Sequence, residues 1–138
     1  MAHKQKILIV EDNADGRELL ALYIRRLGYE VFEAATGLEA LDQAHAVHPD
    51  LILMDLALPK MPGYEATARL KADPSTRDIP VIVNTAFHKG PFVESAIAAG
   101  AAEILHKPVS LKALEEVVRR YLSPLLMPSE TDCRVSVS

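Results

Sequence analysis

Three acids, a hydroxyl and a lysine stand at the ends of short apolar runs in this sequence, and together they could handle a phosphoryl group. Carboxylates that are crowded together repel one another, so a cluster of them needs a cation. Oxygen ligands that leave room for water suit Mg²⁺ or Mn²⁺ better than zinc. A lysine and a hydroxyl beside such an ion could hold further phosphoryl oxygens while one aspartate attacks in line. The five residues are Glu11, Asp12, Asp55, Thr85 and Lys107.

The segments around these residues alternate short β-branched runs with longer stretches of helical periodicity. Helix ends are indicated by Gly28 and Gly100, which are suited to C-terminal caps. Thr36 and Glu39 fit a capping box at a helix start, and Ser110 fits an N-cap. Strands are therefore predicted over residues 7–10, 29–34, 51–54, 81–83 and 103–106, each followed by a helix.

Strands this apolar must be covered on both faces, which is typical of a parallel sheet with helices on each side. The predicted fold is α/β, a doubly wound (βα)5 five-stranded parallel sheet in the order 2-1-3-4-5, flavodoxin-like. The apolar helix faces that would cover it include Leu19, Leu38 and Leu111. In such a sheet, ligands bind outside the carboxyl ends of the strands, where the five reactive side chains are expected to converge.

Length and composition limit the alternatives. The chain has 138 residues and a formal net charge of −4, with 49% hydrophobic and 25% charged residues, which indicates one globular domain. We predict a domain over residues 1–122 and a flexible C-terminal tail over residues 123–138 that contains the single cysteine, Cys133. The acidic balance argues against direct nucleic-acid binding, and the short apolar runs argue against membrane insertion. The start of the chain does not resemble a secretory signal, so a cytoplasmic protein is predicted.

Four segments carry a resemblance to a known family. They are residues 7–13 (ILIVEDN), 50–63 (DLILMDLALPKMPG), 79–86 (IPVIVNTA) and 100–108 (GAAEILHKP). In this order and at predicted strand ends, they resemble the receiver domain of bacterial response regulators in two-component systems. The resemblance covers about residues 6–122 and is to single-domain, chemotaxis-regulator-like members.

The resemblance implies a role for each residue of the predicted site. Asp55 is then the phospho-acceptor, Thr85 the switch hydroxyl and Lys107 the phosphoryl-binding lysine, with a cis bond before Pro108. The implied cofactor is Mg²⁺, with Mn²⁺ as an alternative. Its implied ligands are Asp12 directly, Glu11 usually through water, Asp55, and the backbone carbonyl of Ala57.

The resemblance also implies partners. A sensor histidine kinase or a phosphotransfer protein would donate the phosphoryl group, and an unidentified downstream protein would read the switch. The protein would not be an enzyme beyond promoting its own phosphorylation and dephosphorylation. Apolar positions on the last two helices could pair two copies as a homodimer.

Alternative functions stay open on the sequence alone. The chain could be a phosphorylation-independent scaffold of receiver shape or the receiver portion of a larger hybrid kinase, although the Met1 start favours a free-standing protein. A haloacid-dehalogenase-type phosphatase is disfavoured because Ala57 stands where that chemistry needs a second aspartate.

Two features depart from the usual receiver pattern or bear on its lifetime. Ile104 stands where the family often has an aromatic residue that moves with the switch hydroxyl. Ala57 and Phe87 flank the predicted site without a polar group that could orient an attacking water, which predicts slow self-dephosphorylation. His45 and His48 are interpreted as surface histidines rather than metal ligands.

Overall fold

Strands and helices alternate along the whole of the chain that the computed structural model describes, which is residues 4–86 and 89–122. The strands form one parallel sheet in the order β2-β1-β3-β4-β5, so the predicted fold class and strand order are confirmed. The elements are β1 (Lys6–Val10), α1 (Ala14–Arg26), β2 (Glu30–Ala34), α2 (Gly37–Val47), β3 (Leu51–Asp55), α3 (Gly63–Ala72), β4 (Val81–Thr85), α4 (Pro91–Ala99), β5 (Glu103–His106) and α5 (Leu111–Tyr121).

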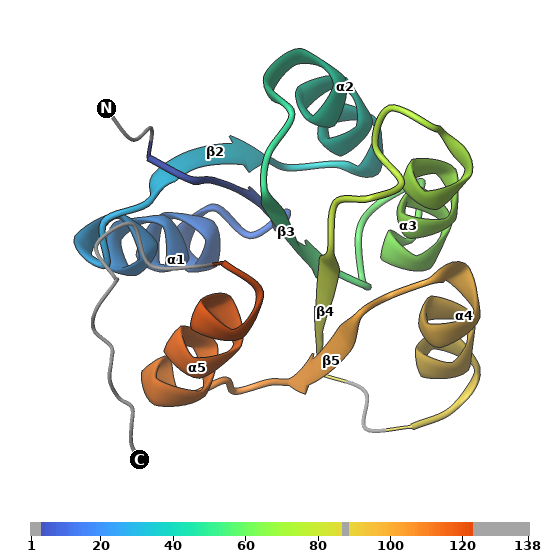
Figure 1. Cartoon of the computed structure of the whole chain (residues 1–138). Coiled ribbons are helices and arrows are strands. Elements are labelled where there is room, and N and C mark those ends of the chain that lie inside the picture. Colours follow the sequence, from blue (N-terminus) through green and yellow to red (C-terminus); the bar gives the residue numbers. More distant parts are fainter. Residues whose placement is uncertain (1–3, 87–88, 123–138) are drawn as a thin grey trace.

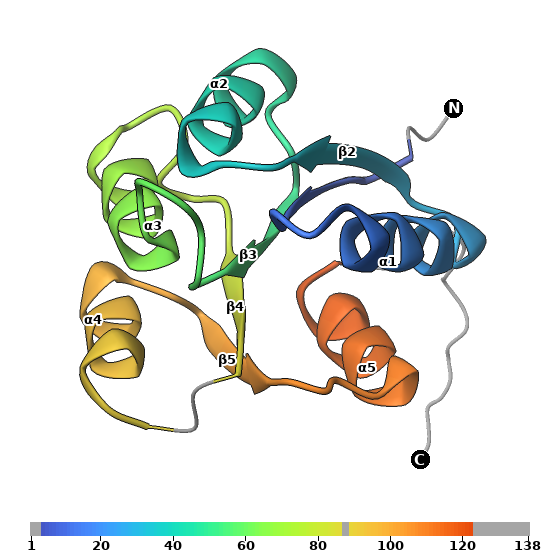
Figure 2. The same ribbon diagram turned by 180° about the vertical axis from the view of Figure 1, so that it is seen from behind.

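Helices cover both faces of this sheet. Figure 1 shows α1 and α5 on one face and α2, α3 and α4 on the other, and the reverse view in Figure 2 shows the same three layers. Alternate residues of each strand serve the two faces: Ile7 and Ile9 pack with α1 and α5, whereas Leu8 and Val10 pack toward α2 and α3. This double burial explains why β1 and β3 read as continuous apolar runs.

Side-chain caps begin three of the helices. Asn13 Oδ1 accepts a hydrogen bond from Gly16 N at 2.8 Å at the start of α1. Thr36 Oγ1 accepts from Glu39 N at 3.1 Å at the start of α2, while the Glu39 carboxylate accepts from Ala35 N at 2.9 Å. The predicted capping box is therefore present, with its return bond shifted by one residue. The predicted Ser110 cap of α5 is confirmed by a 3.0 Å bond from Ala113 N to Ser110 Oγ.

The apolar helix faces are narrower than predicted. Leu19, Leu38 and Leu111 are exposed at 66%, 60% and 51%. Each lies in the first two turns of its helix, beside the carboxyl edge of the sheet, where little strand remains to cover it.

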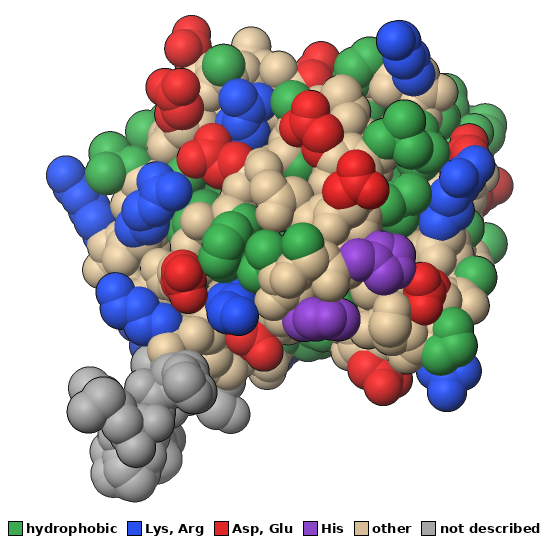
Figure 3. All heavy atoms as spheres, turned by 90° about the horizontal axis from the view of Figure 1, so that it is seen from above, with side chains coloured by type: hydrophobic (Ala, Val, Ile, Leu, Met, Phe, Trp, Pro, Cys, Tyr) green, Lys and Arg blue, Asp and Glu red, His purple; other side chains and the backbone are tan. Residues whose placement is uncertain are grey.

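The view onto α2 in Figure 3 shows acidic and basic side chains interspersed on that side of the molecule. Among the described residues, no helix has the length and apolar character needed to cross a membrane.

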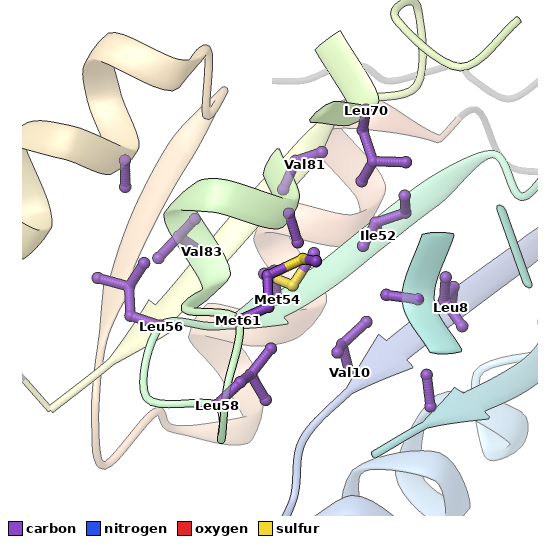
Figure 4. Close-up of a cluster of buried hydrophobic side chains, with 14 of the residues drawn as sticks. Leu8, Val10, Ile52, Met54, Leu56, Leu58, Met61, Leu70, Val81 and Val83 are labelled. Carbon is purple, nitrogen blue, oxygen red and sulfur yellow. The ribbon is translucent and has the colours of Figure 1, made fainter. Parts of the chain in front are cut away.

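The loop after β3 is anchored in the core on the α2–α4 side. Leu56, Leu58 and Met61 of this loop are buried, and Figure 4 shows Met61 beside Met54 of β3 at the centre of that cluster. Their burial fixes the backbone immediately after Asp55. Packing of this loop in the core therefore fixes the end of β3, and Asp55 lies at the carboxyl edge of the sheet.

Candidate functional site

Four of the five predicted reactive side chains stand at or directly after the carboxyl ends of adjacent strands. Asp55 and Thr85 are the last residues of β3 and β4, while Glu11 directly follows β1 and Lys107 directly follows β5. Carboxylate oxygens of Glu11, Asp12 and Asp55 all lie within 4.8 Å of one another. The predicted convergence of the three acids is confirmed as geometry.

Lys107 joins this cluster through two ion pairs. Its Nζ lies 3.1 Å from Glu11 Oε1 and 3.1 Å from Asp55 Oδ2. The bond between Lys107 and Pro108 is cis, as the resemblance implied. The Lys107 backbone N–H donates to Thr85 O at 2.7 Å, which ties the residue after β5 to the end of β4. Thr85 itself is buried in the same neighbourhood.

Two of the three acids of the cluster are buried, and the acids outnumber the one ammonium. Glu11 and Asp55 are 7% and 5% exposed, whereas Asp12 is exposed to solvent. Burial raises the pKa of Glu11, and the nearby Asp55 charge raises it further. For Lys107, burial alone lowers the pKa, but the Asp55 and Glu11 carboxylates outweigh burial and raise it.

The donor set fits a hard divalent cation. Three carboxyl groups face one ammonium, so acidic groups outnumber basic ones, and all the ligand atoms offered are oxygens. Hard oxygen ligands around partly solvated space suit Mg²⁺. Ala57, whose carbonyl the resemblance implied as a further ligand, donates its backbone N–H to Asp55 Oδ1 at 3.1 Å.

Two residues near Glu11 hold its backbone and carboxylate in place. The Asn13 backbone N–H donates to Glu11 Oε2 at 3.2 Å. Arg17 Nη1 donates to the Glu11 carbonyl at 2.7 Å, while Arg17 Nε pairs with Glu33 at 3.1 Å. No sequence motif marks Arg17, because its role depends on its contact with Glu33 of β2.

Gly63 is a second position whose role the sequence alone does not reveal. A Cβ added there would lie 2.1 Å from the carbonyl oxygen of Asp55, so any side chain would push the backbone of the acceptor strand. The Gly63 backbone N–H donates to Leu56 O at 2.9 Å and closes the loop. The glycine therefore allows α3 to start against the end of β3.

Asn84 is the third. It is the register neighbour of Asp55 on β4, and its side-chain oxygen is buried without a hydrogen-bond partner among the described residues. A polar residue inside the apolar run of β4 was the available signal.

Two further expectations concern Ile104, at the usual position of the switch aromatic, and Phe87, which bears on the phosphoryl lifetime. Ile104 of β5 is half-buried and packs against the core on the α2–α4 side. Phe87, on which the lifetime prediction partly rests, lies outside the described residues, as do Cys133 and the predicted tail.

Comparison with known proteins agrees with this geometry. Residues 7–119 match the family model described as the response regulator receiver domain. The polar-differentiation response regulator DivK of Brucella ovis is 42% identical over 118 residues, which cover 86% of this chain and 96% of DivK.

Two solved structures extend the comparison. The receiver domain of the sensor histidine kinase PA1611 from Pseudomonas aeruginosa, which has a magnesium ion coordinated in its active-site cleft, matches with a TM-score of 0.81 and 34% identity, covering 86% of this chain and 98% of that one. The chemotaxis protein CheY4 of Vibrio cholerae matches with a TM-score of 0.82 and 28% identity, covering 87% and 100% of the two chains.

Proposed function

This chain belongs to the response regulator receiver domain family, and we propose that Asp55 is the residue at which it accepts a phosphoryl group. Receiver domains are phospho-accepting signalling switches that work with histidine kinases and downstream effectors. The observation that carries the assignment is the Lys107 ammonium, which bonds both Asp55 and Glu11 inside the three-carboxylate cluster. The proposed receiver domain spans residues 1–122.

In the proposed transfer, an Asp55 carboxylate oxygen forms a bond to phosphorus while the bond from phosphorus to the donor histidine nitrogen breaks. The leaving imidazole keeps that electron pair, and no oxidant or reductant is needed. Lys107 Nζ, already 3.1 Å from Asp55 Oδ2, is positioned to bind a phosphoryl oxygen as negative charge builds there. The hydroxyl of Thr85 is proposed to bind another phosphoryl oxygen after transfer.

The cofactor is Mg²⁺, with Glu11, Asp12, Asp55 and the Ala57 carbonyl as its proposed ligands. When bound, the ion neutralises phosphoryl oxygens and orients the group for in-line attack. The protein residues supply the rest: Asn13 and Arg17 hold Glu11, and the Ala57 N–H holds Asp55. The excess negative charge of the cluster supports this assignment.

The phosphorylated state would signal by favouring a conformation that a partner binds. We propose a sensor histidine kinase or phosphotransfer protein as donor, an unidentified downstream protein as reader, and action in the cytoplasm without direct nucleic-acid binding. Ile97 of α4 and Leu111 of α5 are 58% and 51% exposed, which supports this side as the surface for the reader or for a second copy. The protein would catalyse no reaction beyond its own phosphorylation and dephosphorylation.

Intact mass spectrometry after incubation with Mg²⁺ and acetyl phosphate tests the function. The wild-type chain is expected to gain the mass of one phosphoryl group, and Asp55→Asn is expected to gain none. A chain that stays unmodified with Mg²⁺ present would instead favour the phosphorylation-independent scaffold. A gain that persists in Asp55→Asn would move the acceptor to another residue.

A further inference from the structure

Asn84 is a polar residue near the carboxyl end of β4, directly beside the proposed acceptor. On β4 it pairs in register with Asp55 of β3 on one side and with Leu105 of β5 on the other. Residues two apart on a strand point to the same face, so Asn84 shares the face of Ile82, and Asp55 shares the face of Leu53. Ile82 and Leu53 both pack in the core beneath α1 and α5. The side chains of Asn84 and Asp55 therefore stand next to each other.

The Asn84 carboxamide oxygen is buried, yet it has no hydrogen-bond partner within residues 4–86 and 89–122. Together with Glu11, Asp55 and Leu20, Asn84 lines a cavity of about 10 Å³ between α1 and the sheet edge. It also lines the wider groove that Lys107 faces. A buried acceptor without a donor destabilises a fold, and a valine here would match the rest of β4 without that cost. Such a penalty beside reactive groups indicates a role that appears when those groups rearrange.

Lys107 is a donor close to that oxygen, because Lys107 and Asn84 line the same groove. An ammonium has three N–H groups, and the two carboxylates of Glu11 and Asp55 account for two of them. Lys107 Nζ lies 3.1 Å from Asp55 Oδ2, and Asp55 is the strand neighbour of Asn84. When a phosphoryl oxygen takes the place of the Asp55 carboxylate, the ammonium must turn. A neutral acceptor alongside can hold it without competing for its charge.

We propose that Asn84 is a positioning residue for phosphoryl transfer: its carboxamide oxygen accepts a hydrogen bond from the Lys107 ammonium as that ammonium turns to the incoming phosphoryl group. This inference rests on the proposed function of Asp55 and Lys107. Asn84 itself forms no bond to phosphorus and carries no charge. Its effect is on the rate of transfer rather than on binding of the donor.

The test compares Asn84→Val with Asn84→Ser and with wild type, using acetyl phosphate at saturating Mg²⁺. Losing a hydrogen bond to a charged group in the transition state is expected to lower the maximal phosphorylation rate constant about tenfold in Asn84→Val. The half-saturating acetyl phosphate concentration and the Mg²⁺ dissociation constant, measured by calorimetry, should change less than about twofold. Asn84→Ser keeps a short acceptor and should recover part of the rate.

Gln5 provides a matched control, because its side-chain oxygen is the other buried acceptor without a partner among the described residues. It precedes β1, at the edge of the sheet opposite the site. Gln5→Leu and Asn84→Val are both expected to keep or raise the free energy of unfolding, but only Asn84→Val should slow phosphorylation. If Asn84→Val is phosphorylated at the wild-type rate, like Gln5→Leu, the positioning role is wrong. Wild-type protein that takes up no phosphoryl group would instead overturn the proposed function itself.

Discussion

The acidic cluster at the carboxyl edge and the turn between α3 and β4 shift the pKa of a carboxyl group in opposite directions. In the turn, the Asp73 carboxylate accepts hydrogen bonds from Ser75 N at 2.9 Å, from Ser75 Oγ at 2.8 Å, and from His45 Nε2 at 2.6 Å. These donors lower its pKa to about 2, with the Ser75 backbone bond contributing most. In the cluster, burial and the Asp55 charge raise the pKa of Glu11 instead.

This difference distinguishes a carboxylate that stabilises the fold from carboxylates that are arranged to bind a ligand. In the turn, the donors of Ser75 and His45 satisfy the Asp73 carboxylate without a bound ion. The cluster gathers three acids around the single ammonium of Lys107, and two of those acids are buried. A group bound only by the folded state stabilises it, so Mg²⁺ should raise the stability of this protein through the cluster alone.

The largest expected effect comes from removing the ammonium of the cluster in Lys107→Met. Phosphorylation by acetyl phosphate should slow by about 100-fold or more, because charge on the transferring group loses its stabilising partner. Without Mg²⁺, the free energy of unfolding should fall by roughly 1–2 kcal/mol, since Glu11 and Asp55 remain buried. We expect less than for a fully buried pair because the Lys107 side chain is 33% exposed.

Urea unfolding with and without Mg²⁺ measures this effect, and Lys112→Met, an exposed lysine of α5, serves as the charge-matched control. Added Mg²⁺ should restore more stability to Lys107→Met than to wild type. Equal stability and equal phosphorylation rates in the two lysine variants would contradict the assigned role of Lys107.

Asp12→Asn should weaken Mg²⁺ binding by about tenfold or more, because the substitution removes one anionic oxygen of the proposed ligand set. Since Asp12 is exposed, the free energy of unfolding without Mg²⁺ should stay within about 0.5 kcal/mol of wild type. Titration calorimetry gives the affinity. Asp15 is an exposed acid in the first turn of α1, so Asp15→Asn should bind Mg²⁺ as wild type does. An equal loss of Mg²⁺ affinity in Asp15→Asn would show that net charge, not the ligand set, causes the effect.

Glu11→Gln should raise the free energy of unfolding in the absence of Mg²⁺ by about 1 kcal/mol, because it removes a buried charge that Asp55 repels. The same variant should gain less stability than wild type when Mg²⁺ is added. Glu18→Gln removes one exposed negative charge from α1 and should change neither quantity. A Glu11→Gln protein that is less stable than wild type without Mg²⁺ would show that the Lys107 ion pair outweighs the repulsion.

The smallest effect is expected at the turn, in His45→Gln. Both His45 ring nitrogens face acceptors, Leu41 O at 2.8 Å and Asp73 Oδ2 at 2.6 Å, which favours the doubly protonated ring. The Asp73 hydrogen bond, the Leu41 carbonyl and the charges of Asp73 and Asp42 raise the pKa of His45 above 6.5, although desolvation by burial lowers it.

The sign of the pH dependence follows from this direction. The His45 contribution is complete below about pH 6.5 and is lost as pH rises through the folded-state pKa. The Asp73 contribution is lost as pH falls from about 4 toward 2. Urea midpoints of wild type should therefore approach those of His45→Gln as pH rises from about 6.5 through the folded-state pKa of His45. A constant difference across this range would contradict the paired imidazolium.

The sequence predicted the sheet and the acidic site because both depend on where the apolar strands begin and end. Continuous apolar runs marked the central strands, and a reactive residue at a strand end must lie at the carboxyl edge of a parallel sheet. Asp55 and Lys107, 52 residues apart, could thus be brought together without any contact information.

The residues that the sequence did not reveal depend on contacts between side chains rather than on periodicity. Leu19 fits the apolar spacing of α1, yet it projects beyond the cover of the sheet. His45 was expected to be a surface histidine and is exposed, but its bond to Asp73 links α2 to the turn after α3. Asn84 follows the predicted strand 81–83 without a motif of its own, and only its register with Asp55 gives it significance.

Locating the phosphoryl group directly is the measurement that tests the central claim. After incubation with Mg²⁺ and acetyl phosphate, borohydride reduces an aspartyl phosphate to homoserine, and peptide mass spectrometry identifies the position. We expect homoserine at Asp55 and at no other acid of the cluster. Homoserine at Asp12, or at an acid outside the cluster with Asp55 unchanged, would contradict it.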